Sequence, residues 1–135
     1  MSIPPYTHLT RDDLIWLAGL LEGEGTFDLH KARYPRIRLG MADRDVVGRA
    51  ATLIGASIRM TLSTQEHKPM FHTELSGARA AELMVMLLPH MGARRSSKIG
   101  EVLGKYARYT GQQTGSVFPG PALTRPPGFI PAMSK

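Results

Sequence analysis

The chain has 135 residues, 42% of them hydrophobic, which supports one compact domain with a core and leaves little for a second. Lysine and arginine outnumber aspartate and glutamate by 17 to 11, so the formal charge is +6, which favours a polyanionic partner if the excess is clustered. The absence of cysteine excludes disulfides and thiolate metal sites, and the lack of an apolar signal-peptide or membrane-span segment leads us to expect a soluble intracellular protein with no membrane partner.

The first predicted helix covers residues 11–23. Thr10 and Asp13 have the spacing of a capping box, and the nearly continuous apolar run that follows predicts a helix buried almost all round. The segment LAGLLEGEG, residues 17–25, ends this helix on two carboxylates, Glu22 and Glu24, separated by Gly23. Because the carboxyl end of a helix carries a partial negative charge, these carboxylates require a compensating positive group.

Four segments with period-two alternation predict four strands. In the first strand of the first pair, Phe27 and Leu29 alternate with Asp28 and His30. Tyr34 and Pro35 mark a bend. In the second strand, Ile37, Leu39 and Met41 alternate with Arg36, Arg38 and Gly40. In the second pair, Ile58, Met60 and Leu62 alternate with Arg59 and Thr61, residues 67–69 form a turn, and Phe71, Thr73 and Leu75 alternate with His72 and Glu74. Each strand therefore has one apolar face and one polar face.

Three further helices are predicted. Asp43 or Asp45 caps the first, which carries Val47, Ala50 and Ile54 on one face and ends at Gly55. Ser76 caps the next, which buries Ala80, Leu83, Met84 and Leu87 and stops at Pro89, and the last covers about residues 97–109 and buries Ile99, Val102, Leu103 and Tyr106. The order of elements predicts an α+β domain whose antiparallel four-stranded sheet has helices on one face and an open second face.

Composition divides the chain into three parts. Residues 1–9 form an N-terminal arm and residues 10–109 form the domain. Residues 110–135 contain five prolines and four glycines, too many helix and strand breakers for a regular element, and are expected to form an extended tail.

The excess positive charge is clustered on the predicted open face. Lys31, Arg33, Arg36 and Arg38 lie within eight residues of one another, and Arg59 joins them on the third strand. Arginines on a sheet face suit contacts with phosphates and with guanine in a major groove. A solvated face that carries charge for solubility gives the same pattern, so charge alone leaves both interpretations open.

The first helix has a face with almost no side chains. Gly19 and Gly23 are four residues apart and Ala18 is beside Gly19, so a second helix can approach closely. In a chain this small, we expect that helix to come from a second copy of the chain. Two-fold symmetry would then bring the two Glu24 carboxylates together, where a divalent cation such as Mg²⁺ would relieve their repulsion.

The segment LAGLLEGEG resembles the LAGLIDADG motif of homing endonucleases. It matches the first four letters, has an acidic residue at both acidic positions and keeps the final glycine. The predicted order of elements in residues 10–109 is similar to the αββαββα core of that family. This segment departs from the family motif in having glutamate at both positions where the motif has aspartate. The extra methylene of glutamate moves the carboxylate oxygens.

The resemblance implies a homodimer that cuts double-stranded DNA at a near-palindromic site, hydrolysing one phosphodiester in each strand with divalent metal, Mg²⁺ or another. By position, Glu24 and the Gly23 carbonyl would ligate metal, Glu22 would be mostly structural, and Ala18, Gly19, Glu22 and Gly23 would lie at the dimer interface. Arg94, Arg95 and Lys98 fall where the family places basic active-site residues. Asp43 falls near a position where the family places a polar residue that organises water. A role for Asp43 as a helix cap agrees equally well with the sequence.

The resemblance also implies that DNA lies along the open sheet face. The side chains expected to contact it are Asp28, His30, Lys31, Arg33, Arg36, Arg38, Arg59, Thr61 and His72. Two alternatives remain open: a protein of this fold that binds DNA, or RNA as a splicing cofactor, without cutting, and an unrelated basic domain whose glycine face is merely core. The last alternative predicts a monomer.

Overall fold

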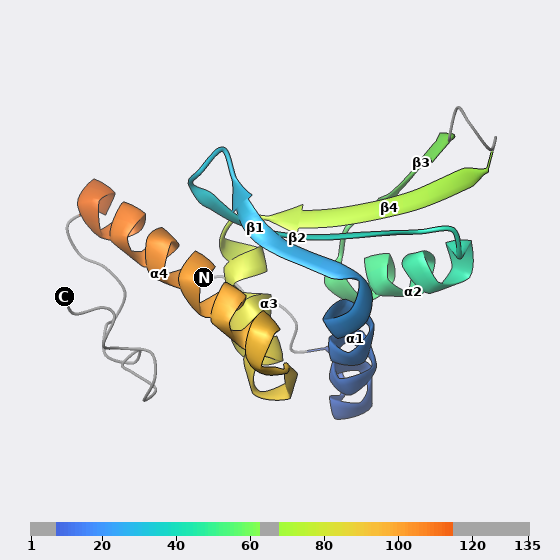
Figure 1. Cartoon of the computed structure of the whole chain (residues 1–135), viewed down its shortest axis with the longest axis horizontal. Helices are drawn as coiled ribbons and strands as arrows, with labels where there is room; N and C mark the ends of the chain where they lie inside the picture. The colour runs from blue at the N-terminus through green and yellow to red at the C-terminus, as the bar shows by residue number, and fades with distance from the viewer. Residues whose placement is uncertain (1–7, 63–67, 115–135) are drawn as a thin grey trace.

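The computed structural model describes residues 8–62 and 68–114 (Figure 1). The elements are α1 (Arg11–Glu24), β1 (Gly25–His30), β2 (Tyr34–Met41), α2 (Arg44–Ile54), β3 (Ile58–Leu62), β4 (Pro69–Ser76), α3 (Ala78–Leu87), the short 3-10 helix η1 (Leu88–His90) and α4 (Ala93–Thr114). This order confirms the predicted α+β class and the αββαββα arrangement, with α4 added after it. Among the described residues, no helix combines the length and the apolar character that a bilayer crossing requires.

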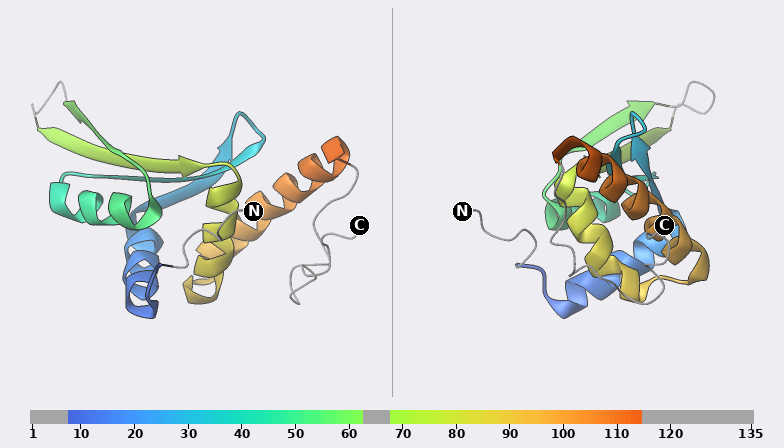
Figure 2. Two further views of the ribbon diagram at one scale, coloured as in Figure 1. Left: turned by 180° about the vertical axis from the view of Figure 1, so that it is seen from behind. Right: turned by 90° about the vertical axis from the view of Figure 1, so that its left-hand side faces the viewer.

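The four strands form one antiparallel sheet in the order β1-β2-β4-β3. All four long helices lie on one side of it, and the opposite side is bare, as the views in Figures 1 and 2 agree. The β1–β2 hairpin and the free end of the β3–β4 pair both bend away from the helices, so the bare side is concave (Figure 1). The prediction of helices on one face and an open second face is therefore confirmed.

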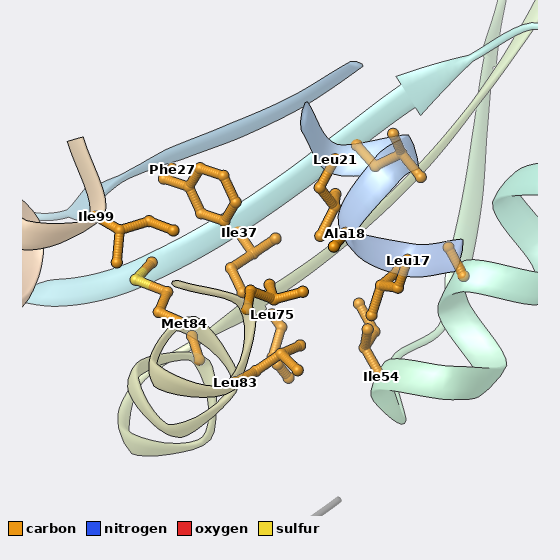
Figure 3. Close-up of a cluster of buried hydrophobic side chains, with 14 of the residues drawn as sticks. Leu17, Ala18, Leu21, Phe27, Ile37, Ile54, Leu75, Leu83, Met84 and Ile99 are labelled. Atoms are coloured by element: carbon orange, nitrogen blue, oxygen red, sulfur yellow. The ribbon is translucent and has the colours of Figure 1, made fainter. Parts of the chain in front are cut away.

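The core lies between the sheet and the helices (Figure 3). Every element except β3 and η1 contributes buried apolar side chains: Leu17, Ala18 and Leu21 from α1, Phe27 from β1, Ile37 and Leu39 from β2, Val47, Ala50 and Ile54 from α2, Leu75 from β4, Leu83, Met84 and Leu87 from α3, and Ile99 and Val102 from α4. Full burial of one such large side chain stabilises the fold by about 1.5–3 kcal/mol. The alternation seen in the sequence thus places the sheet's apolar face correctly.

The turn between β1 and β2 differs from the prediction. It lies at residues 31–33, where the Arg33 N–H donates to the His30 carbonyl at 3.0 Å, and not at Tyr34 and Pro35. Those two residues begin β2 instead, with Pro35 paired to Leu29 and its carbonyl accepting the Gly77 N–H at 2.8 Å. Proline at the start of a strand costs little, because its fixed φ is compatible with extended backbone.

Lys31 and Ala32 form this turn in the left-handed region, with φ of 55° and 59°. Because that region costs a residue with a Cβ about 1–2 kcal/mol, Ala32→Gly is expected to raise the free energy of unfolding by about 0.5–1 kcal/mol after the entropy of glycine is deducted. Urea denaturation measures the change. The control, Ala107→Gly in α4, should lose about 1 kcal/mol, since Ala107 is in an ordinary helix. A loss in both variants would contradict the interpretation.

The predictions for the last two helices need correction. Ser76 ends β4 and does not cap α3; the cap position is Gly77, whose φ of 89° lets the chain leave the sheet. The α4 helix begins four residues before the predicted Ser97 and continues to Thr114, so residues 110–114 are helical and not extended. The remainder of the predicted tail, most of the arm and the first residue of the turn at residues 67–69 lie outside the described residues, and Pro69 begins β4.

One expectation about burial is wrong, and one apolar strand face is less buried than its neighbours. The α1 helix is not buried all round: Ile15 is 43% exposed, because only the stripe of Leu17, Ala18 and Leu21 faces the core. Met60 and Leu62 of β3 are 56% and 62% exposed although they point to the apolar side of the sheet. The outer end of β3 is a sheet edge that rises away from α2 (Figure 1), so no helix covers these two side chains.

Candidate nucleic-acid interface and metal site

The bare side of the sheet carries the polar residues of every strand. Because residues alternate between the two faces, the buried Phe27, Ile37 and Leu75 place their neighbours on the open side. The antiparallel register then sets rows across the sheet: Asp28 is opposite Arg36, Arg38 is opposite Glu74, and His72 lies between Gly40 and Arg59. Seven predicted DNA-contacting residues therefore share this face, namely Asp28, His30, Arg36, Arg38, Arg59, Thr61 and His72, and Lys31 and Arg33 lie in the β1–β2 turn at its end.

Asp28 is the centre of a charged network on this face. Arg36 donates from Nε to Asp28 Oδ1 at 2.9 Å and from Nη2 to Oδ2 at 3.1 Å, and Arg38 Nη2 donates to Oδ2 at 2.6 Å. Arg36 Nη1 lies 3.0 Å from His30 Nδ1, and since a guanidinium has only donors, the histidine nitrogen accepts. Arg36 and Arg38, both part of the cluster of positive charge seen in the sequence, thus share one carboxylate.

The hydrogen bonds from Arg36 hold the pKa of Asp28 below its ordinary value of 3.8, and the charges of Arg38 and Arg36 act in the same direction while partial burial opposes them. A carboxylate with a lowered folded-state pKa stabilises the fold in full above its unfolded pKa, and this contribution disappears as the pH falls through the folded value. We therefore expect Asp28→Asn to lower the free energy of unfolding at pH 7 and to have a much smaller effect at pH 2.5. Urea denaturation at both pH values measures this, and an equal effect at both would contradict it.

His72 lies flat on the open face. A Cβ placed on Gly40 would come within 2.8 Å of His72 Nδ1, so the ring covers the glycine of the adjacent strand. On its other side, His72 Nε2 is 2.9 Å from Thr61 Oγ1. His72 and Gly40 lie between Arg59 and the charged network around Asp28: Arg59 pairs with His72 on β4, and His72 pairs with Gly40 on β2.

The tip of the sheet is tied to the far end of α4. The Arg33 guanidinium lies 5.3 Å from the centroid of the Tyr109 ring, and Tyr34 packs edge-on to the same ring at 6.2 Å. A cation within about 6 Å of an aromatic face is attracted to it. Arg33 therefore has a partner within the chain, whereas Lys31 is exposed at the turn.

The carboxyl end of α1 is locked to the amino end of α4. Glu22 Oε1 accepts the Gly92 N–H at 2.9 Å, and Arg95 Nε donates to the Glu22 carbonyl oxygen at 3.1 Å. The Gly92 carbonyl accepts the first hydrogen bond of α4, from Ser96, so Glu22 caps that helix. The positive end of α4 and the Arg95 guanidinium supply the charge that the acidic end of α1 requires. We call these two contacts the Glu22 latch.

Glu24 is placed differently from Glu22. It is the last residue of α1, is exposed, and precedes Gly25, the first residue of β1. Gly25 is packed so closely on α1 that an added Cβ would lie 2.6 Å from Leu21 Cδ2. This close packing fixes the point where the chain passes from helix to strand and holds the Glu24 backbone at the edge of the sheet.

Comparison with known proteins shows the fold. No family model matches the chain, and no protein of curated function matches it. Among solved structures, the homing endonuclease I-TnaI is 13% identical with a TM-score of 0.54 over 74% of this chain and 76% of that chain. The homing endonuclease I-CvuI, in complex with the I-CreI target in the presence of 2 mM Mg and with its DNA not cleaved, is 10% identical with a TM-score of 0.52, over 76% and 71%.

The chain has the homing-endonuclease fold. The resemblance seen in LAGLLEGEG is thereby confirmed at the level of architecture, and α1, which carries this segment, continues directly into the sheet. Identities of 10% and 13% do not carry activity, so the roles of individual residues remain predictions.

Within the homing-endonuclease fold, the predicted basic residues lie beside the first strand. Arg94, Arg95 and Lys98 line an open hollow that also contains Thr26 and has about 380 Å³ of space accessible to water. Arg95 is held in the Glu22 latch, and Lys98 Nζ is 3.7 Å from Glu101 Oε1. Arg94 is exposed and has no ion pair among the described residues. Arg94 and Lys98 are therefore the two cations with side chains available to a phosphate.

Asp43 lies at the other side of the same edge. It follows β2 and occupies the N-cap position of α2, but its side chain makes no capping hydrogen bond. Because Gly25 pairs with Leu39, the start of β1 and the end of β2 are at the same end of the sheet. Glu24 and Asp43 thus both border this end, with an exposed carboxylate each.

The end of the sheet that Glu24 and Asp43 border offers oxygen ligands for a divalent metal, but a single chain offers few of them. In residues 8–62 and 68–114, no group of three or more histidine, aspartate or glutamate side chains is arranged to hold a metal ion. A single chain offers the Glu24 carboxylate and the Gly23 carbonyl, which is in the last turn of α1 where carbonyls lack intrahelical donors. These are oxygen ligands of the kind that Mg²⁺ prefers, and they fit it once a second chain and water add the rest.

The predicted dimer face is only partly present. Gly19 and Gly23 are exposed, a Cβ on either would meet no atom within 4 Å, and the exposed Ile15 lies one turn before Gly19 on the same side. Ala18 does not belong to this face, because it is 2% exposed and points into the core (Figure 3). Glu22 has its carboxylate in the latch instead. We call Ile15, Gly19 and Gly23 the open α1 stripe.

Sequence reasoning missed three residues at these surfaces. Thr26 and Glu74 lie on either side of Arg38 in the open-face row, and Ile15 extends the open α1 stripe. Alternation placed Glu74 on the polar side of its strand, but it was not among the residues predicted to contact DNA. Thr26 immediately precedes Phe27, so the same alternation would have placed it on the open face.

Proposed function

We propose that this chain is a site-specific endonuclease of double-stranded DNA that acts as a homodimer with divalent metal ions. The observation that supports this most directly is the position of Glu24: exposed at the end of α1, at the edge of the open basic face, and on the same helix as the open α1 stripe. Packing the stripes of two chains against each other would bring both Glu24 side chains to the symmetry axis.

In this dimer, the Glu24 carboxylates and the Gly23 carbonyls would hold Mg²⁺ or another divalent ion. The bound ion supplies a nucleophilic water at neutral pH and charge stabilisation for the leaving oxygen. Arg94 and Lys98 face the hollow beside β1, where their charges would bind and orient the scissile phosphate. Arg95, fixed to the Glu22 carbonyl, positions the helix that carries them. Asp43 borders the same edge and would hydrogen-bond water there.

The open face would follow the DNA on both sides of this centre. Its concave shape matches a cylinder; Lys31 and Arg33 lie toward one end and Thr61 toward the other, while Asp28, His30, Arg36, Arg38, Arg59 and His72 lie between. Contacts to phosphates position a protein on the duplex, and contacts to base edges specify the sequence. Two such faces related by a two-fold axis suit a near-palindromic site.

The test is cleavage of a randomised duplex library by the full chain with Mg²⁺, followed by sequencing of the new ends and of the bound pool. Paired cuts around one near-palindromic sequence are the expected result. Enrichment of a sequence that stays whole with Mg²⁺, Mn²⁺ and Ca²⁺ would show a recognition protein, with RNA the next ligand to test. If the chain is a monomer and enriches no DNA sequence, the endonuclease proposal is wrong and this fold has an unrelated activity.

A further inference from the structure

Arg36 and Arg38 are neighbours on the same strand face, but the structure gives them different tasks. Each nitrogen of the Arg36 guanidinium already donates: Nε and Nη2 to Asp28, and Nη1 to His30. The Arg36 side chain is also only 19% exposed. Its Nε/Nη2 edge is therefore occupied by Asp28 and little of its side chain is open to a ligand, so its role is to hold the Asp28 carboxylate in place.

Arg38 has a free edge in a fixed orientation. Its side chain is 45% exposed, and Nη2 is bound to Asp28 at 2.6 Å. Among the described residues, no acceptor is hydrogen-bonded to its Nε or Nη1. Because Nη2 uses only one of its two hydrogens for Asp28, its second hydrogen and one on the adjacent guanidinium nitrogen form an open two-donor edge. Because Arg36 grips Asp28 from the other side, the carboxylate is rigid and the plane of the Arg38 guanidinium is set by it. A pair of donors fixed in one plane is suited to two acceptors at hydrogen-bond spacing.

The surroundings of Arg38 favour a base edge over a phosphate. Its neighbour across β4 is Glu74, which is exposed on the same face. A carboxylate repels the phosphate backbone, whereas it accepts a hydrogen bond from the amino group of cytosine. The two acceptors that match an arginine fork in the major groove are O6 and N7 of guanine. The pair Arg38 and Glu74 therefore fits the major-groove edge of a G·C pair.

We propose that Arg38 reads one guanine in each half-site and that Asp28 is the positioning residue that sets its orientation. This inference rests on the proposed DNA-binding function and adds to it a specific base at a specific side chain. Arg36 and His30 support Asp28 and do not read bases. Of the three arginines on the open face, Arg38 thus contacts the base, Arg36 holds Asp28 in place, and Arg59 lies on the edge strand away from both.

The first experiment is selection of bound duplexes from a randomised library with Ca²⁺, comparing wild type with three variants. Wild type is expected to enrich one guanine position in each half-site. Arg38→Gln should reduce that preference by about 5- to 150-fold and leave the other positions unchanged, as expected for loss of one bidentate contact. Asp28→Asn should weaken the preference at the same position without lowering non-specific affinity, because it raises the net positive charge.

Arg59→Gln is the matched control. It removes the same charge from the same face, but Arg59 is separated from the network by His72. It should weaken binding to all duplexes through fewer phosphate contacts and reduce the salt dependence, while the guanine preference remains. Loss of that guanine in Arg59→Gln, or its retention in Arg38→Gln, overturns the assignment.

A second measurement changes the DNA, so its deciding comparison uses the wild-type protein alone. The selected duplex is synthesised with 7-deazaguanine at the guanine position, which replaces the N7 acceptor by carbon. Wild type should bind this duplex more weakly than the unmodified one, and Arg38→Gln should bind both equally. Equal binding by wild type overturns the proposal.

These outcomes separate the inference from the proposed function. If the chain selects the guanine through Arg38 but never cuts DNA, the endonuclease proposal is wrong and the proposal that Arg38 reads a guanine stands. A chain that cuts at a site whose specificity is unchanged in Arg38→Gln would retain the endonuclease proposal and disprove the proposal that Arg38 reads a guanine. A wild type that selects no sequence disproves the latter proposal, because no guanine is then read.

Discussion

Glu24→Gln is expected to abolish cleavage while DNA binding persists. The glutamine side chain has nearly the same shape but no charge, so it would remove a metal ligand's negative charge without changing how α1 meets the sheet. Since a bound metal contributes several kcal/mol to the transition state and 1.36 kcal/mol corresponds to a factor of ten, the expected loss is about 1,000-fold or more. Cleavage of the selected duplex under single-turnover conditions, beside a binding titration in Ca²⁺, measures both properties.

The matched control is Asp12→Asn, which makes the same charge change at the other end of α1, in its first turn. This variant should cut the duplex at the wild-type rate. If Glu24→Gln also cuts at that rate, Glu24 is not a metal ligand, and the metal would have to bind elsewhere at the end of the sheet, with Asp43 as the next residue to change.

Gly19→Gln is expected to make the chain more stable and yet unable to pair. In the single chain an added side chain meets no atom within 4 Å, and replacing helical glycine by glutamine stabilises a helix by about 0.5 kcal/mol. In a two-fold dimer through the open α1 stripe, the new side chain would be inserted twice into a close helix contact. At about 1–3 kcal/mol for each overpacked site, the dimer should weaken by about 2–6 kcal/mol.

Sedimentation velocity and urea denaturation together test this. Gly48→Gln on α2 is the control, because Gly48 also has no atom within 4 Å of an added Cβ and lies on a different helix. It should gain similar stability and keep the wild-type oligomeric state and cleavage. Dimers that survive in Gly19→Gln at the wild-type dissociation constant would show that the chains pair through another surface.

The fold was predictable from the sequence because its signals are local. Alternation at residues such as Phe27, Ile37 and Leu75 fixed which side of each strand faces the core, and the capping box of Thr10 and Asp13 is present as predicted. The errors occurred where a distant residue decides the local structure. The α4 helix starts early because Glu22 caps it, and no nearby residue reveals this.

The candidate site was predictable only in part, for a related reason. The segment LAGLLEGEG identified Glu24 and the glycines, which are consecutive in the sequence. The sharing of Asp28 between Arg36 and Arg38 depends on the register of β1 against β2, and alternation does not give a register. For the same reason, Ala18 was assigned to a dimer face on spacing alone, although the rotation of α1 on its own core turns it inward.

The Glu22 latch has a consequence for how the chain folds. It joins residues 70 positions apart, so the first turn of α4 gains its cap only after the end of α1 is in place. Each doubling of the loop that a contact closes adds only about 0.6 kcal/mol of entropic cost, but non-local contacts of this kind are associated with slower folding. The helix that carries Arg94 and Lys98 therefore depends on the acidic end of α1 for the cap of its first turn.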